Sequence, residues 1–471
     1  MKRLVLINPR NRASLYGDYL WQPLALAYVA AATPKHWSVE LIDEQCEGAL
    51  DYSDVAADLV GLTAFTTQAP RAYRIAQQFR SRGIPVVMGG IHASLVQAEA
   101  AQYADALFVG ECEARWPEAV ADAERGQLAR IYDGGRTGES LVLPDRSIFG
   151  KYRYEYASAQ TSRGCPMDCS FCSVTAFNGR LFRMRDVSAV VDEVASIEQR
   201  DIIFVDDDLN GFSRNATKRC LDLFRAMADA RLDKRWITQV TINFGDDDEL
   251  PASARAAGCA GVFIGLESTD RKSLAFVRKD GTSQRRGVDY YRENLARIHR
   301  HGIGVVGSFI LGIDTQDMDT IVSDILRFAE ESELDGLNPT ILTPLPGTRD
   351  FARLDAEGRI LFKNYPDDWE KYTLAFPVTH MPNITGAGLM RRYVEVLQFF
   401  RPEHIAELYW RTHDRVSPDA AWHAFLWNRV WANYCQQRGV FRDAAGGAAS
   451  RSEIPRAAPP PAAYGERAIA R

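Results

Sequence analysis

The segment Thr161-Ser-Arg-Gly-Cys165-Pro-Met-Asp-Cys169-Ser-Phe-Cys172 sets three cysteines four and three positions apart on one short stretch of chain. Thiolates are soft ligands that suit iron–sulfur clusters, and three of them on one loop can hold three irons of a cubane, which leaves the fourth iron open. A zinc site needs a fourth ligand at comparable spacing, and the next cysteine is the distant Cys220. The segment therefore predicts a 4Fe-4S cluster on Cys165, Cys169 and Cys172, with a zinc site or a chance grouping of reduced cysteines as the alternatives.

Short apolar runs alternate with helical patterns on both sides of this segment. Around and after the cysteines the candidate strands are residues 158–162, 202–205, 236–242, 261–266, 304–310 and 336–342. Each run is followed by a helical or polar stretch, which is typical of βα units. Six such units suit a partial, open (β/α)6 barrel better than a full eight-fold barrel, so residues 156–350 are predicted to form one.

A second α/β series precedes the cysteines, over residues 1–130. Its candidate strands are residues 3–8, 38–42, 59–63, 85–88 and 106–109, with amphipathic stretches between them, as in a doubly wound parallel sheet. Ligands of such sheets bind at the carboxyl ends of the strands. Glycines and small polar residues there leave backbone N–H groups open to a ligand, although they also suit tight βα turns. The residues at these ends are Thr63, Gly89, Gly90, His92, Gly110 and Glu111.

Three further segments complete the predicted organisation. Residues 131–155, with Gly134-Gly135 and Pro144, are expected to connect the two α/β units. Residues 351–440 are mostly helical in pattern and rich in aromatic side chains. Residues 441–471, rich in Ala, Pro, Gly and Arg, are expected to be disordered. The fold class is therefore α/β, with a mainly helical C-terminal segment.

The amino-acid composition limits the possible binding partners but says little about the reaction. The chain has 471 residues, of which 46% are hydrophobic and 25% charged, as in ordinary globular proteins of two or three domains. A net charge of −6 gives no reason to expect nucleic acid or an acidic membrane surface as a partner. Neither a transmembrane stretch nor a signal peptide is predicted, so we expect a cytoplasmic protein with reduced thiols.

The cysteine segment resembles the motif of the radical S-adenosylmethionine (SAM) enzymes, Cys-x3-Cys-x2-Cys with an aromatic residue, here Phe171, before the last cysteine. The resemblance implies that the open iron binds the amino and carboxylate groups of SAM. It also implies that an electron from the cluster cleaves SAM to a 5′-deoxyadenosyl radical, which abstracts hydrogen from carbon. A reducing partner such as flavodoxin or ferredoxin would supply that electron.

Segments after the later strands extend the resemblance over most of the chain. They are Phe204-Val-Asp-Asp-Asp208, Gly261-Val-Phe-Ile-Gly-Leu-Glu267-Ser268, Gly307-Ser-Phe-Ile-Leu-Gly312 and Thr343-Pro-Leu-Pro-Gly-Thr348. By analogy, Asp207 or its neighbours lie near the amino end of SAM, and Glu267 and Ser268 contact its ribose or methionine portion. Many relatives have Gly-Gly-Glu where this chain has acidic residues. An acidic triplet can also cap a helix.

The N-terminal unit resembles the cobalamin-binding domain that one subgroup of these enzymes carries before the barrel. The matching strand ends are Leu62-Thr63, Gly89-Gly90-Ile91-His92 and Gly110-Glu111. The pattern Asp-x-His-x2-Gly, in which histidine ligates cobalt, is missing, because no Asp stands two positions before His92. The resemblance therefore implies base-off cobalamin, with the strand-end residues as its contacts.

The subgroup's chemistry implies methyl transfer to an inert carbon of a small-molecule substrate, such as a lipid, a tetrapyrrole or another natural product. Radical cyclisation or rearrangement without methyl transfer is the alternative. An iron–sulfur redox or binding protein is a more distant one, since such a protein would place a fourth cysteine near the triad. The sequence alone assigns no catalytic residue.

Overall fold

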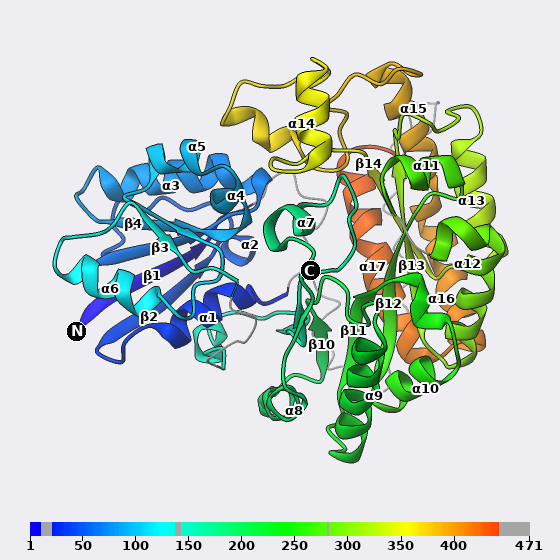
Figure 1. Cartoon of the computed structure of the whole chain (residues 1–471), viewed down its shortest axis with the longest axis horizontal. Helices are drawn as coiled ribbons and strands as arrows, with labels where there is room; N and C mark the ends of the chain where they lie inside the picture. Colours follow the sequence, from blue (N-terminus) through cyan, green and yellow to red (C-terminus); the bar gives the residue numbers. More distant parts are fainter. Residues whose placement is uncertain (11–20, 137–142, 280–281, 442–471) are drawn as a thin grey trace.

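The computed structural model describes residues 1–10, 21–136, 143–279 and 282–441. It contains two six-stranded parallel sheets side by side, with helices packed on them (Figure 1). The predicted disordered tail, apart from Phe441, lies outside the described residues. Over the described ranges, the structure has no helix long and apolar enough to cross a membrane.

The first sheet is the predicted doubly wound sheet, with strand order β2-β1-β3-β4-β5-β6. Its strands are β1 (Lys2–Asn8), β2 (Trp37–Asp43), β3 (Leu59–Thr63), β4 (Val86–Gly89), β5 (Ala106–Val109) and β6 (Ile131–Asp133). The strand order reverses between β1 and β3, where doubly wound folds bind ligands. The expectation of a plain connector from residue 131 is wrong at its start, because β6 pairs with β5.

Helices cover both faces of this sheet because side chains along each buried strand alternate in direction. Val5 and Ile7 of β1 pack with one group of helices, and Leu4 and Leu6 with the other. The first group is α3 (Ala69–Arg80), α4 (Gly90–Leu95) and α5 (Gln97–Tyr103), and the second is α1 (Leu24–Ala32) and α6 (Trp116–Glu124). The short helix α2 (Glu44–Glu47) follows β2.

The second sheet is the predicted partial barrel, with all neighbours parallel in the order β14-β13-β12-β11-β10-β7. Its strands are β7 (Ala157–Ala159), β10 (Asp201–Phe204), β11 (Arg235–Val240), β12 (Cys259–Glu267), β13 (Gly304–Leu311) and β14 (Gly336–Ile341). Its helices are α8 (Val187–Ser196), α9 (Arg214–Asp229), α10 (Glu249–Ala256), α11 (Arg271–Phe276), α12 (Thr282–Arg300) and α13 (Ile321–Glu331). The predicted strand 158–162 is divided, since β8 (Ser162–Arg163) leaves the sheet to pair antiparallel with β9 (Arg183–Met184).

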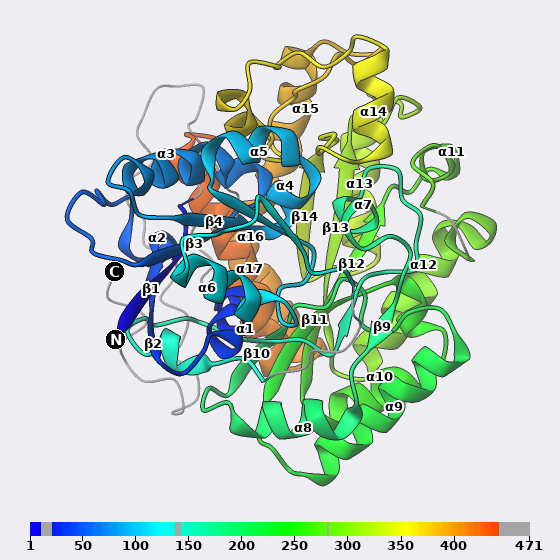
Figure 2. The same cartoon turned by 60° about the vertical axis from the view of Figure 1, so that its left-hand side comes forward.

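The C-terminal segment closes the open side of the barrel. It comprises α14 (Arg349–Ala356), α15 (Gly386–Leu397), α16 (Pro402–Arg415) and α17 (Pro418–Gln437). Helix α17 packs on β12, β13 and β14, on the side of the second sheet that faces the N-terminal unit (Figures 1 and 2). Trp427 fixes it there by donating its Nε1–H to the carbonyl of Leu337 at 2.8 Å.

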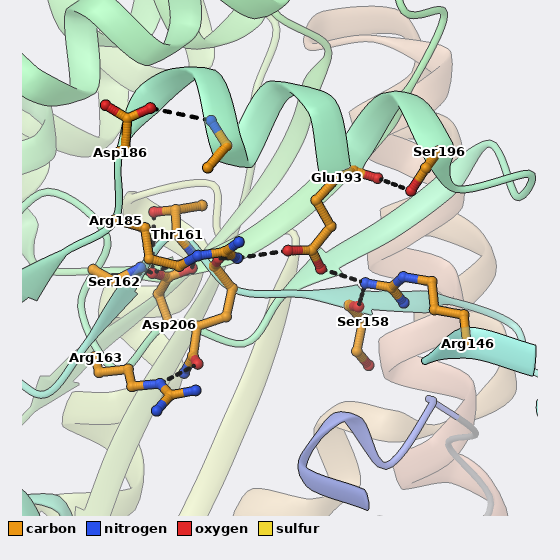
Figure 3. A network of polar contacts seen from close by, with 12 residues as sticks. Arg146, Ser158, Thr161, Ser162, Arg163, Arg185, Asp186, Glu193, Ser196 and Asp206 are labelled. Atoms are coloured by element: carbon orange, nitrogen blue, oxygen red, sulfur yellow. Dashed lines mark hydrogen bonds and ion pairs between the residues drawn. The ribbon is translucent and has the colours of Figure 1, made fainter. Parts of the chain in front are cut away.

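Polar contacts link the segments that flank the barrel to the N-terminal unit and to the barrel itself. Trp369, in the loop before α15, donates its Nε1–H to Glu99 of α5 at 3.0 Å. Arg146, which precedes β7, and Arg185, which follows β9, both donate to the buried carboxylate of Glu193 on α8, each at 2.6 Å (Figure 3). Arg146 also donates to the carbonyl of Ser158 at 2.7 Å, so this network fixes the first barrel strand.

Candidate active site

The three cysteines lie on the loop between β8 and α7 (Ser173–Asn178), and Cys172 is the N-cap residue of α7. Gly164 starts the loop with φ of +82°, and a Cβ there would overlap the carbonyl oxygen of Leu181, so the position requires glycine. In the middle of the loop, Ser170 donates its N–H to the carbonyl of Val277 at 3.0 Å and its hydroxyl to Asp350 at 2.9 Å. These contacts hold the loop in place.

The donor set fits an iron–sulfur cluster. Burial raises the pKa of all three thiols, that of Cys169 to about 12, so the thiolates need a bound cation to form at neutral pH. Over the described residues, no three His, Cys, Asp or Glu side chains surround a point that could hold a single metal ion. In a cubane each thiolate binds a different iron, so three cysteines on one loop suit a cluster.

A cation that the sequence analysis missed lies beside this loop. The ammonium of Lys279 lowers the pKa of each of the three thiols electrostatically, against the larger effect of burial. It pairs with Glu267 at 3.1 Å. Burial alone would lower the pKa of Lys279, but the charge of Glu267 holds it above its usual value. No spacing rule identifies this lysine, since β12 and the turn after α11 bring it to the cysteines.

The three aspartates after β10 make different contacts. Asp206 is fully buried and accepts hydrogen bonds from Thr161 and Ser162, so it fixes the start of the cysteine segment (Figure 3). Asp207 accepts from the N–H of Gly164 at 2.9 Å, and Asp208 lies 4.0 Å from the Cys165 sulfur. Burial raises the pKa of Asp207 and of Asp208 to about 6. The triplet does not cap a helix, because α9 is capped by Ser213.

Two predicted SAM contacts have local partners in the structure. Glu267 ends β12 with φ of +62° at a bulge, and its carboxylate pairs with Lys279. Ser268 is buried and accepts from the N–H of Asp270 at 3.0 Å, which stabilises the turn before α11. Ser268 thus has a role in that turn, and the contacts of Ser268 and Glu267 with SAM remain predictions.

A narrow cavity of about 370 Å³ opens where the first sheet faces the cysteine loop. It runs from the strand ends down the sheet face past Gly61 to Trp116. A Cβ on Gly61 would lie 2.7 Å from Leu6, so glycine keeps this slot open. A slot that reaches into the sheet fits the extended tail of base-off cobalamin. Its lining includes five of the predicted cobalamin contacts, namely Thr63, Gly89, Gly90, Gly110 and Glu111. Asp207, which is predicted to lie near SAM, also lines it.

Ion pairs join this slot to the cysteine segment. Glu111 pairs with Arg163 at 3.1 Å and with Arg183 at 2.6 Å, and Glu113 pairs with Arg163 at 2.5 Å. Burial alone would raise the pKa of Glu111, but the two guanidinium groups hold it below its usual value. Glu111 does not cap the next helix, because the N-cap of α6 is Arg115. The end of β5 is thus fixed to β8 and β9, the two strands that flank the cysteine loop and α7.

The structure corrects the prediction that His92 contacts a ligand at the end of β4. Its side chain is 0% exposed, its Nε2 lies 3.0 Å from the hydroxyl of Tyr73, and its ring packs edge-on against Trp369. Neither the slot nor the larger cavity described next is lined by it. A histidine one residue after a Gly-Gly turn can face a ligand or the helix core, and here it faces the core.

The larger cavity, of about 640 Å³, lies between the two sheets and under α17. Thr63, Phe65 and Ile91 from the first sheet line one side, and Ser173, the residue after the third cysteine, lies at its edge. The inner faces of β10 to β13 form the opposite wall. Phe65 is 66% exposed although it lies between the two units, because it faces both cavities.

Comparison with known proteins agrees with this geometry. Residues 160–328 match the family model of the radical SAM superfamily, and residues 15–120 match that of the B12 binding domain. The chain therefore carries a B12-binding domain followed by a radical SAM domain. Its cofactors are accordingly a 4Fe-4S cluster, SAM and cobalamin.

Individual relatives point to methyl transfer. The chain is 26% identical to bacteriochlorophyllide d C-12(1)-methyltransferase of Chlorobaculum tepidum, over 84% of this chain and 86% of that protein. It is 26% identical to hopanoid C-2 methylase of Rhodopseudomonas palustris, over 76% and 68%. An anaerobic magnesium-protoporphyrin IX monomethyl ester cyclase of Rubrivivax gelatinosus is 27% identical, over 80% and 73%. The methyltransferase interpretation is the better supported of the two.

The fold is also found among solved structures. The radical SAM methyltransferase TsrM of Kitasatospora setae superposes with a TM-score of 0.67 at 15% identity, over 91% of this chain and 99% of that chain. The two parallel sheets and the helical C-terminal region are thus a known arrangement.

Proposed function

We propose that this chain is a C-methyltransferase that holds an apolar small molecule in the larger cavity and methylates one of its unactivated carbons. The observation that carries the proposal is the position of that cavity. Its wall includes Thr63 and Phe65, at the mouth of the cobalamin slot, and Ser173, next to the third cysteine. A substrate in this cavity lies between the sites of both cofactors.

Each cofactor is assigned to residues of this chain. Cys165, Cys169 and Cys172 hold the cluster, and Asp207 and Glu267 face SAM. The strand-end residues Thr63, Gly89, Gly90, Gly110 and Glu111 would hold cobalamin. When bound, the cluster and SAM supply the radical that removes a hydrogen atom, and cobalamin supplies the methyl group.

The chain's own part is to place the substrate and to exclude water. Isoleucine, valine and phenylalanine side chains from β10 to β13 form the cavity wall, and they leave a reactive carbon radical few groups to attack. The electron donor is proposed to be a cytoplasmic flavodoxin or ferredoxin.

An anaerobic assay tests the proposal. The protein is reconstituted with iron, sulfide and hydroxocobalamin and given SAM, a strong reductant and candidate lipid and tetrapyrrole substrates. 5′-Deoxyadenosine and S-adenosylhomocysteine are then quantified together. We expect both products, and we expect 5′-deoxyadenosine to be lost in Cys165→Ala, Cys169→Ala and Cys172→Ala.

Radical cyclisation without methyl transfer is the second candidate, because one relative is a cyclase. The same assay separates the two. 5′-Deoxyadenosine without S-adenosylhomocysteine would favour cyclisation or rearrangement. A fully loaded cluster that yields neither product with any substrate would contradict an enzymatic role.

A further inference from the structure

The larger cavity has an uncharged lining. Among the described residues that line it there is no Asp, Glu, Lys or Arg. Its titratable groups are Tyr372 and His423, and both are neutral at pH 7. Burial raises the pKa of Tyr372, and burial, assisted by the charge of Arg235, lowers the pKa of His423 to about 3.

The floor of this cavity is formed by one face of α17. Ala420, His423, Ala424 and Trp427 follow each other at helical spacing and all line the cavity. Across from them, β12 and β13 present Gly261 and Gly304. A Cβ on Gly304 would already lie 3.1 Å from the Cβ of Ala420. Glycine at this position therefore lets α17 pack directly on β13, and this contact closes the cavity at its inner end.

Polar groups lie at the opposite end. Asn8, Gln45, Thr66, Thr67 and Gln68, from the strand ends of the first sheet and the segments that follow them, line the part of the cavity next to the N-terminal unit. These side chains form hydrogen bonds but carry no charge. The cavity is thus apolar at depth and neutral but polar at its cofactor end.

Resting on the proposed function, we propose that the substrate is a neutral, lipid-like molecule, such as a polycyclic or polyprenoid hydrocarbon. Its apolar part lies against α17 and the apolar side chains of β10 to β13, and any polar group it carries is uncharged. A carboxylate or phosphate in this cavity would lose its hydration and gain no described cationic partner, which is strongly unfavourable. A tetrapyrrole acid would meet this penalty, whereas a hydrocarbon would not.

Two fluorescent probes with nearly the same rings test the charge requirement. N-phenyl-1-naphthylamine is neutral, and 8-anilinonaphthalene-1-sulfonate adds one sulfonate. Titrated into the reconstituted full-length holoenzyme, the neutral probe is expected to bind at least about tenfold more tightly, because only the sulfonate must be desolvated. Equal or tighter binding of the sulfonate would overturn the proposal.

Variants test whether the probe occupies the floor. Ala424→Phe fills the space beside α17 and is expected to weaken the neutral probe by about tenfold or more. Ala387→Phe, the same change at an exposed position on α15, is expected to leave the affinity within about twofold. Circular dichroism and cluster absorbance show whether each variant is folded and loaded.

A milder variant keeps the test decisive if Ala424→Phe does not fold. A Cβ on Gly261 would lie 3.5 Å from the carbonyl oxygen of Gly304 and 3.6 Å from Ile237, which are ordinary contact distances, so Gly261→Ala fits without strain and still narrows the cavity. If the folded floor variants leave the neutral probe's affinity unchanged, the proposal is wrong. Probe binding does not depend on SAM cleavage, so loss of S-adenosylhomocysteine formation with the probe results intact would contradict methyl transfer alone.

Discussion

Gly90→Ala should separate cobalamin binding from cluster binding. Gly90 has φ of +88°, and a Cβ there would lie 2.6 Å from the Thr63 hydroxyl and 2.9 Å from the Ala64 nitrogen. Ordinary contact begins at 3.4 Å, so β3 and α4 must separate by about 0.8 Å at the mouth of the slot. The left-handed backbone adds about 1–2 kcal/mol of strain.

The assay is retention of cobalamin after anaerobic reconstitution and desalting, with iron and sulfide measured on the same samples. We expect Gly90→Ala to weaken cobalamin binding by about tenfold or more, equal to about 1.4 kcal/mol, and to keep its iron, since the cysteine loop lies outside the distorted turn. Gly83→Ala is the matched control, because Gly83 has φ of +75° and a Cβ there would have no neighbour within 4 Å. Normal cobalamin retention in a folded Gly90→Ala would refute the assignment of the slot, and equal losses in both variants would show that strain alone is responsible.

Three further predictions concern charge. Glu193→Gln leaves the guanidinium groups of Arg146 and Arg185 without their buried anion, and it should lower the free energy of unfolding in urea by about 3–5 kcal/mol. Glu198→Gln, at an exposed position on the same segment, is the control. A loss below about 1 kcal/mol in Glu193→Gln would contradict the role given to the network. Lys279→Met removes the cation beside the three thiols, and it should make the reduction potential of the cluster more negative in an electron paramagnetic resonance titration. Lys279→Arg keeps the charge and should largely preserve the potential. An unchanged potential in Lys279→Met would count against a contact between Lys279 and the cluster. Burial alone would raise the pKa of Glu99, but hydrogen bonds from His92, Tyr73 and Trp369 hold it below its usual 4.5. A carboxyl whose pKa is lower in the folded than in the unfolded protein stabilises the fold, completely above about pH 4.5, and this stabilisation is lost as the pH falls through the folded-state pKa. Glu99→Gln should remove this part of the pH dependence of the free energy of unfolding. An unaltered pH profile in the variant would refute the role given to Glu99.

The strands were predictable because they are short, buried and separated by helical patterns. The predicted 59–63 and 106–109 coincide with β3 and β5, and the other runs except 158–162 match to within a residue or two. β6 was missed because three residues carry no periodicity, and only pairing with β5 makes them a strand. Local sequence thus determines an element where a buried run is long enough to show its period.

The site was predictable only where its residues are neighbours in sequence. The three cysteines lie on one loop, so their spacing alone indicates a cluster. Lys279 reaches them through the barrel fold, and nothing in its own surroundings marks it. His92 shows the opposite error, since a residue next to a ligand-binding turn was assigned to the ligand although its ring belongs to the contact between α3 and Trp369.

The cobalamin slot and the cysteine loop share a wall, so their geometries depend on each other. Arg163 and Asp207 both line the slot. Arg163 directly precedes Gly164, whose N–H donates to Asp207, and Cys165 follows. Arg163 is held in turn by Glu111 and Glu113 at the end of β5. We therefore expect a displacement of that strand end to move the first cysteine, because only one residue separates it from Arg163. These ion pairs, more than the length of the connector, would then set the spacing between the slot and the cysteine loop.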